Sequence, residues 1–277
     1  MKAQPLADLS RCAVHTVTTK PWSIETAIEK YARAGFGGIT VWRDTLEGRD
    51  PIVVGKQIRD AGLRNTALVR GGFFCYGNEE ERAKALEDNR LALREAEATG
   101  APMVVLVCGA RPEQSLGESR EQIRDGIAEL LPEAEARGVV LAIEPLHPMY
   151  ADTRSAVNTL ASANDMAESL DSPWVGIAVD VYHLWWDPDL PAQIRRCGKN
   201  GNLTAFHVCD WRVPTEDFLL DRGLMGEGCI DVPGIRAVVE EAGFTGFNEV
   251  EIFSKRRWEG DQDAWLADIA RACREAV

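Results

Sequence analysis

The chain has 277 residues, of which 45% are apolar and 27% charged, as is ordinary for a globular protein with a sizeable core. Its formal net charge of −13 argues against nucleic acid as a partner, because phosphate binding needs a basic face, and suits a small neutral or metal-chelating substrate. No linker and no block of like charge divides the sequence, so we expect residues 1–277 to form a single domain.

Apolar, strand-like runs alternate with helix-like segments along the whole chain. In chain order, the expected strands are 9–17, 38–42, 66–69, 103–107, 139–143, 174–179, 203–208 and 247–252. The expected helices are 21–34, 52–61, 78–99, 118–137, 152–170, 191–197, 232–242 and 264–275, with Asp152 as the candidate cap of the fifth. Strands that alternate with helices are typical of a parallel sheet, because parallel neighbours need a crossover connection.

Eight such units in about 250 residues predict a closed (β/α)8 TIM barrel. The alternative is an open doubly wound sheet, which is less favoured because no GxGxxG follows the first strand and no GxxxxGK[ST] occurs in the chain. In a barrel the catalytic groups lie at the C-terminal ends of the strands. The residues that end each strand are therefore the candidates for a functional site.

The last four expected strands each end in a side chain that can bind a metal. These side chains are Glu144, Asp180, His207 and Glu251. Adjacent strand ends of a closed barrel converge at its mouth, and three carboxylates with one imidazole suit a hard or borderline divalent ion. We expect one such ion, Mn²⁺ in the first place and otherwise Mg²⁺, Co²⁺ or Zn²⁺. The alternative is four unrelated polar residues that are satisfied by backbone amides and water.

The last strand carries two glutamates, Glu249 and Glu251, which point to the same side because they are two residues apart. Glu251 is nearer to the C-terminal end of the strand and is the predicted metal ligand. Glu249 is then expected one layer deeper, where it supports another side chain; the alternative is that the strand end lies two residues away from the predicted one.

Further candidates for substrate binding fall at or just beyond the same strand ends. They are His15, Trp42, His147, His183 and Arg212. His183 lies three residues after Asp180, and His147 is presented rigidly between two prolines. Arg212 is a candidate clamp for a substrate oxygen, and Trp42 a candidate pocket wall. Each has a structural alternative: a histidine packed on tryptophan, a solvated arginine or a core aromatic residue.

The cysteines and the first residues bear on the compartment. Seven cysteines are scattered and never spaced as CxxC, which is the pattern of reduced thiols. The segment MKAQPLADLSR has no apolar signal core, and no stretch approaches the ~18 apolar residues of a membrane span. We therefore expect a cytoplasmic protein without a membrane partner, and leave open whether it forms a homo-oligomer.

Four segments carry a family resemblance: VVLAIEPLHP, GIAVDVYHLWWDP, AFHVCDW followed by DRGLMGEGCID, and GFNEVEIFS. They resemble the sugar phosphate isomerase/epimerase group of the xylose isomerase-like TIM barrels, most closely between Val139 and Ser254. The resemblance implies one divalent ion held by Glu144, Asp180, His207 and Glu251.

The same resemblance implies roles in catalysis. Glu144 and Glu251 would be the acid/base pair that moves a proton of the substrate carbon, and His183 would contact the substrate. Arg212 matches the family's arginine after the histidine strand only approximately.

The chemistry of such a site indicates the reaction class. A proton beside a carbonyl group becomes removable when the developing enediolate is stabilised, which a divalent ion supplies. We expect a metal-dependent isomerase or epimerase of a keto-sugar, sugar phosphate or keto-inositol. The alternative is a lyase or dehydratase of a keto-sugar or dehydroshikimate-like acid. The complete set of candidate metal-binding side chains disfavours a barrel that binds sugar without catalysis. A multi-zinc endonuclease is disfavoured because the acidic chain has only four histidines.

Overall fold

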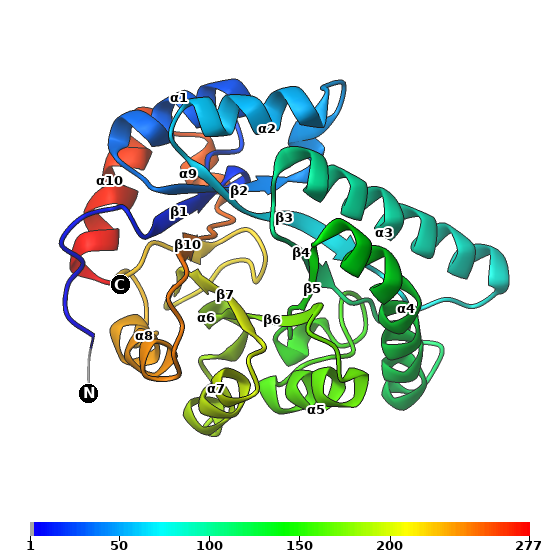
Figure 1. Cartoon of the computed structure of the whole chain (residues 1–277). Coiled ribbons are helices and arrows are strands. Elements are labelled where there is room, and N and C mark those ends of the chain that lie inside the picture. Colours follow the sequence, from blue (N-terminus) through cyan, green and yellow to red (C-terminus); the bar gives the residue numbers. More distant parts are fainter. Residues whose placement is uncertain (1–2) are drawn as a thin grey trace.

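The computed structural model describes residues 3–277 as eight parallel strands that close into a barrel surrounded by helices (Figure 1). The barrel strands are β1 (Cys12–His15), β2 (Gly38–Trp42), β3 (Arg64–Gly72), β4 (Met103–Val107), β5 (Val140–Ile143), β6 (Val175–Asp180), β7 (Leu203–Val208) and β10 (Asn248–Val250). They pair in chain order, and β10 closes the barrel by pairing with β1. The expected (β/α)8 barrel is confirmed, and the open doubly wound sheet is excluded.

Helices connect the strands on the outside of the barrel (Figure 1). The longer ones are α1 (Ile24–Ala34), α2 (Pro51–Asp60), α3 (Glu79–Thr99), α4 (Leu116–Arg137), α5 (Leu160–Leu170), α7 (Leu190–Lys199), α8 (Val232–Glu241) and α10 (Gln262–Glu275). Short helical turns are η1 (Thr16–Thr19), η2 (Arg43–Leu46), η3 (Pro148–Tyr150), α6 (Val181–Leu184) and α9 (Lys255–Trp258). Over the described residues, no helix combines the length and apolarity needed to cross a membrane.

The largest error of the sequence prediction is the start of the fifth helix. Helix α5 begins at Leu160 and is capped by Thr159, so the predicted start and cap at Asp152 are wrong. The segment before it bonds instead to the chain beyond β4. Gly109 N donates to Arg154 O, and Ala156 N donates to Gly109 O, each at 2.8 Å. Because these backbone groups are engaged with another segment, they cannot form the ladder of a helix.

Two layers of apolar side chains make up the core. Larger aliphatic and aromatic residues fill the layer between the strands and the helices. The inside of the barrel holds mostly small ones: Ala67, Val69, Met103, Val105, Ala142, Ala178 and Ala205. Since strand side chains alternate, the residue two positions beyond an inward-facing alanine also points inward, but nearer to the mouth.

A small hairpin after β7 was not predicted. Strand β8 (Asp210–Trp211) pairs antiparallel with β9 (Arg222–Gly223). The carboxylate of Asp210 is buried and accepts hydrogen bonds from the backbone N–H groups of Gly226, Gly228 and Ile230 at 2.8 to 3.0 Å. These bonds fix the loop after β9 and so hold the hairpin beside the mouth of the barrel.

Candidate metal and active site

The predicted metal-binding side chains share a local pattern, in which each lies two residues beyond an inward-facing residue of its strand. The pairs are Ala142 and Glu144, Ala178 and Asp180, Ala205 and His207, and Glu249 and Glu251. Alanine leaves space at the deeper position, so the longer side chain above it can lie over the barrel axis. Only on β10 does the deeper position carry a charged group.

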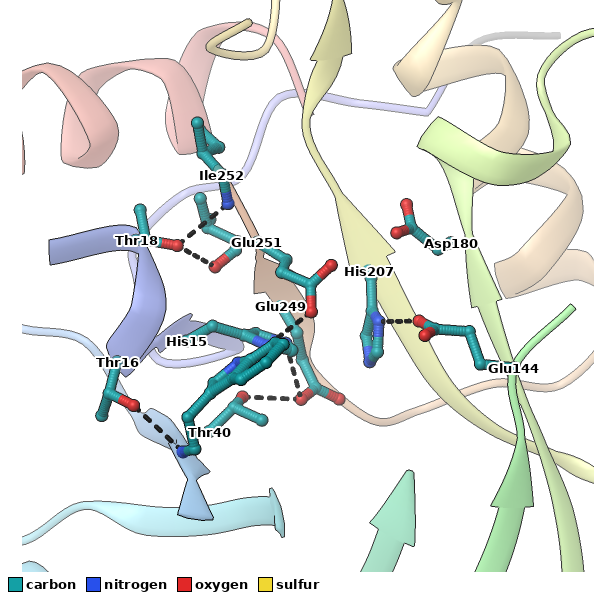
Figure 2. Close-up of polar contacts among 12 residues, drawn as sticks. His15, Thr16, Thr18, Thr40, Glu144, Asp180, His207, Glu249, Glu251 and Ile252 are labelled. Carbon is teal, nitrogen blue, oxygen red and sulfur yellow. Dashed lines mark hydrogen bonds and ion pairs between the residues drawn. The ribbon is translucent and has the colours of Figure 1, made fainter. Parts of the chain in front are cut away.

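The four side chains point into one space at the C-terminal end of the barrel (Figure 2). One ligand atom of each lies within 4.8 Å of the others, and all four residues are buried. Asp180 and His207 are direct cross-strand partners, and His207 Nδ1 lies 2.9 Å from Glu144 Oε1. Glu251 follows β10, where its backbone N donates to Val208 O at 3.2 Å.

The separations in this cluster fit a divalent cation. Around an ion with ligands at about 2.1 Å, neighbouring ligand atoms lie about 3 Å apart and opposite ones about 4.2 Å. The 2.9 Å between His207 Nδ1 and Glu144 Oε1, and the limit of 4.8 Å for the whole set, agree with this geometry. Three carboxylates and one imidazole are also the donor set of Mn²⁺, Mg²⁺, Co²⁺ or Zn²⁺ sites.

The electrostatics of the cluster agree with a place for a cation. Burial raises the pKa of Asp180 to about 7, and the carboxylates of Glu251 and Glu144 add to the rise, against the effect of Arg222. Burial alone would lower the pKa of His207, but the hydrogen bond to Glu144 and the nearby carboxylates raise it to about 10. Without an ion, protons therefore take up the negative charge that a dication would neutralise.

Arg222, which the sequence prediction missed, is the cation that contacts the cluster. Its Nη1 donates to Glu251 Oε2 at 2.6 Å and to Asp180 Oδ2 at 3.1 Å. The rings of Tyr182 and Phe253 face its guanidinium at 4.3 and 4.9 Å. Burial alone would lower the pKa of Arg222, but Glu251 and Asp180 hold it well above its ordinary value. This arginine stays charged and offsets part of the negative charge.

Arg212 is the arginine that the sequence predicted at the site. Its guanidinium pairs with Asp221 and not with the carboxylates of the cluster. The reason is the hairpin, in which the chain turns back after β8 and returns position 222 to the barrel. Arg222 N donates to Phe253 O at 2.9 Å, which ties it to the segment beyond Glu251. The segment DRGLMGEG, which contains Arg222 and carries part of the family resemblance, was the available signal.

His183 lies beside the cluster on the short helix α6. Asp180 Oδ1 caps this helix by accepting from Tyr182 N at 2.7 Å, which fixes the direction of His183. Arg222 Nη2 lies 3.3 Å from His183 Nε2, so the ring nitrogen is placed to accept. Burial holds the pKa of His183 well below its ordinary value, with Arg222 adding to the effect. His183 is therefore a neutral imidazole in contact with the charged groups.

Glu249 lies below the metal-binding positions, as the sequence predicted (Figure 2). Its Oε2 accepts hydrogen bonds from the hydroxyl groups of Thr40 and Thr66 at 2.8 and 2.7 Å. His15 Nε2 lies 3.8 Å from the same oxygen. This carboxylate is thus engaged by neighbours of its own, which leaves Glu251 as the glutamate at the mouth.

His15 and Trp42 extend this support toward the cavity. His15 Nδ1 lies 3.1 Å from Glu251 Oε1 and 3.2 Å from the indole nitrogen of Trp42. Trp42 packs edge-on against Phe253 at 5.2 Å and lines the cavity next to Glu251. The structure brings both predicted residues to the site, with His15 behind Glu251 and Trp42 in the wall.

His147 takes a different position from the other histidines. Its Nδ1 accepts from Met149 N at 3.2 Å, and its ring packs at 5.7 Å from Trp186 and 5.4 Å from Trp211. Burial lowers its pKa. These contacts belong to the aromatic cluster beside the mouth and not to the group of metal-binding side chains.

A cavity opens beside the cluster and is covered by the loop between β8 and β9. Glu144, Glu251, His183 and Arg222 line it. The hydroxyl groups of Tyr150 and Tyr182 both donate to Phe218 O, at 2.9 and 2.6 Å. The two bonds hold the covering loop in place, and Leu219 from this loop faces the cavity.

Comparison with known proteins gives the family of this arrangement. The sequence profile of the xylose isomerase-like TIM barrels matches residues 28–276. One similar curated protein is "Putative L-ribulose-5-phosphate 3-epimerase SgbU" of Escherichia coli K12, 26% identical over 201 residues that cover 70% of this chain and 68% of that protein. Another is the inosose isomerase of Bacillus licheniformis, 27% identical over 203 residues that cover 69% of this chain and 67% of that protein.

Solved structures agree with the fold. Protein SMc04130 of Sinorhizobium meliloti 1021 superposes with a TM-score of 0.94 at 44% identity, over 97% of this chain and 99% of the other. The IolI protein with a bound zinc atom superposes with a TM-score of 0.82 at 19% identity, over 94% of this chain and 95% of the other.

Proposed function

This chain belongs to the xylose isomerase-like TIM barrel family, and from that premise we propose that it moves a proton next to the carbonyl group of a keto-sugar in a divalent-metal-dependent reaction. It is an enzyme of the sugar isomerase and epimerase kind, like the curated proteins it resembles. The observation that carries the proposal is the convergence of the buried side chains Glu144, Asp180, His207 and Glu251.

We propose that these side chains hold one ion, with Mn²⁺ as the first choice. The zinc atom in the IolI structure supports a metal in a barrel of this fold. When bound, such an ion supplies positive charge to the substrate oxygens on which negative charge develops. Asp180 and His207 contribute to holding it, and Glu144 and Glu251 combine this task with proton transfer.

Proton transfer is assigned to Glu144 and Glu251. Burial alone would raise the pKa of Glu251, but His15 and Arg222 hold it well below its ordinary value, so this carboxylate is ionised. Glu144 lies on the other side of His207 and lines the same cavity (Figure 2). One carboxylate removes the proton and the other returns it in epimerisation, whereas one carboxylate shuttles it between neighbouring carbons in isomerisation.

Arg222 and His183 are assigned to the substrate oxygens. Both are buried and line the cavity, and both lie against carboxyl groups of the cluster. Donors fixed in a site that excludes water stabilise developing negative charge without reorganising during the reaction. The covering loop, held by Tyr150 and Tyr182, contributes to the exclusion of water.

The test is incorporation of solvent deuterium, followed by NMR, across keto-sugars and inososes with Mn²⁺ added. Wild-type protein should exchange the proton beside the carbonyl group of its substrate, and Glu144→Gln should lower the rate by about 10²–10⁴-fold. Glu135→Gln on the exposed face of α4 is the matched control and should exchange at the wild-type rate. Undiminished exchange in Glu144→Gln would remove this carboxylate from the mechanism. An unsaturated product that absorbs in the ultraviolet would indicate the lyase alternative.

A further inference from the structure

Two arginines at the cavity of the proposed active site form no ion pair with any carboxylate of residues 3–277. Arg70, near the end of β3, and Arg154, in the loop before α5, both line the cavity together with Glu144 and Glu251. Among the residues that the structure describes, neither guanidinium forms an ion pair with a carboxylate or donates a hydrogen bond. The nearby Arg43 differs, because Asp88 and Glu95 pair with it at 2.9 and 2.6 Å.

Each of the two guanidinium groups lies against an aromatic ring. Arg70 lies 4.4 Å from the ring centre of Phe73, and Arg154 lies 5.5 Å from that of Tyr150. An aromatic face limits where a guanidinium can lie but satisfies none of its N–H donors. The donors of both arginines therefore stay available for a ligand.

The positive charges of Arg70 and Arg154 also repel each other. Burial lowers the pKa of Arg70, and the positive charges of Arg154 and Arg43 lower it further, while Asp88 and Asp44 offset part of this effect. Asp44 and Asp88 border the neighbouring cleft, but among the described residues neither they nor any other carboxylate forms an ion pair with the half-buried Arg70 and Arg154. An anion from outside the protein would remove the repulsion and use the free donors.

The position of the pair relative to the metal-binding side chains defines what would bind. Arg70 lines both the cavity and a neighbouring cleft bordered by Arg43 and Asp88, so it stands where the two meet. A substrate whose hydroxyketone lies at Glu144 and Glu251 would direct its far end toward Arg70 and Arg154.

We propose that Arg70 and Arg154 form a subsite for an anionic group of the substrate, which makes the substrate a keto-sugar phosphate or a keto-sugar acid. This inference rests on the proposed function for the placement of the reacting end. It narrows the substrate class, since the names of the similar curated proteins include both a phosphorylated and an uncharged substrate. The overall negative charge of the chain does not describe the local charge at this cavity.

The test is calorimetric titration of the protein, with Mn²⁺ and separately with a chelator, using three probes. L-ribulose 5-phosphate carries a phosphate, 5-ketogluconate a carboxylate, and L-ribulose neither. At least one anionic probe should bind about 10–100-fold more tightly than L-ribulose, and the stronger of the two identifies the group. The variants Arg70→Met and Arg154→Met should each remove this advantage and leave the affinity for L-ribulose unchanged.

The controls separate charge from structure. Arg70→Lys and Arg154→Lys keep the charge and should keep part of the preference, and Arg124→Met removes an exposed charge on α4 and should keep all of it. Equal affinity for all three probes, or an equal loss for anionic and neutral probes in the methionine variants, would overturn the proposal. Deuterium exchange in the same samples reports separately on the proposed reaction, so selective anion binding without exchange would contradict only the latter.

Discussion

The two sides of the barrel mouth use different chemistry. Strands β5, β6, β7 and β10 lead into ionisable side chains that converge on one point. Strands β1, β2 and β3 face them with the imidazole of His15 and the hydroxyl groups of Thr40 and Thr66, which contact the glutamates of the last strand. The first side carries the groups that would react, and the second holds them in place. Substitutions on the two sides should therefore differ in both size and kind.

The sharpest contrast lies between Glu249 in β10 and Glu251 just beyond the end of this strand. Glu251→Gln keeps the shape of the side chain but removes the charge, so turnover should fall by about 10²–10⁴-fold. Glu249→Gln should mainly lower the free energy of unfolding, by about 1–3 kcal/mol, because its bonds from Thr40 and Thr66 lose a charged acceptor. Deuterium exchange and urea unfolding of both variants measure the two effects. Equal losses of turnover would mean that Glu249 also reacts.

The next effect concerns the counter-charge of the reacting side. Arg222→Met leaves Glu251 and Asp180 buried without their cation, and should destabilise the protein by about 3–5 kcal/mol. Arg212→Met is the comparison, because its side chain is 28% exposed and its partner Asp221 keeps a hydrogen bond from Glu216 N, so its cost should be smaller, about 1–3 kcal/mol. Urea unfolding in the presence of a chelator measures both. A larger loss from Arg212→Met would contradict the assignment of Arg222 as the cation of the cluster.

The sequence predicts the reacting side of the barrel mouth better than the supporting side. Glu144 and Asp180 can be identified from the sequence as site residues, because each ends an apolar run. A charged group after a buried strand is costly unless something binds it. Thr40 and Thr66 could not be selected, because threonine is common in strands and its partner Glu249 is about two hundred residues away. Arg222 was missed for another reason: its position depends on the hairpin and on the loop bonds of Asp210, which are long-range.

Removal of the metal should lower the melting temperature through the side chains of the reacting side alone. A ligand at 100 times its Kd stabilises a folded protein by about 2.7 kcal/mol, so a chelator should lower the melting temperature by about 5–10 °C. Asp180→Asn should remove most of this difference between metal-loaded and chelated protein, because it takes away one buried ligand. Thr40→Val should retain the full difference. A melting temperature that changes neither with Mn²⁺ nor with chelator would exclude a metal held by this cluster.

The smallest predicted effect lies on the supporting side. Thr40→Val and Thr66→Val each remove one hydroxyl group from Glu249 Oε2, and each should lower the free energy of unfolding by about 1–2 kcal/mol. The double variant should lose more than the sum of the two, because either hydroxyl alone still satisfies the buried oxygen. Without both, the described residues offer this oxygen only His15, at 3.8 Å. Urea unfolding of the four proteins gives this coupling energy. Strict additivity would mean that the two hydroxyls stabilise Glu249 independently, and would contradict the predicted coupling.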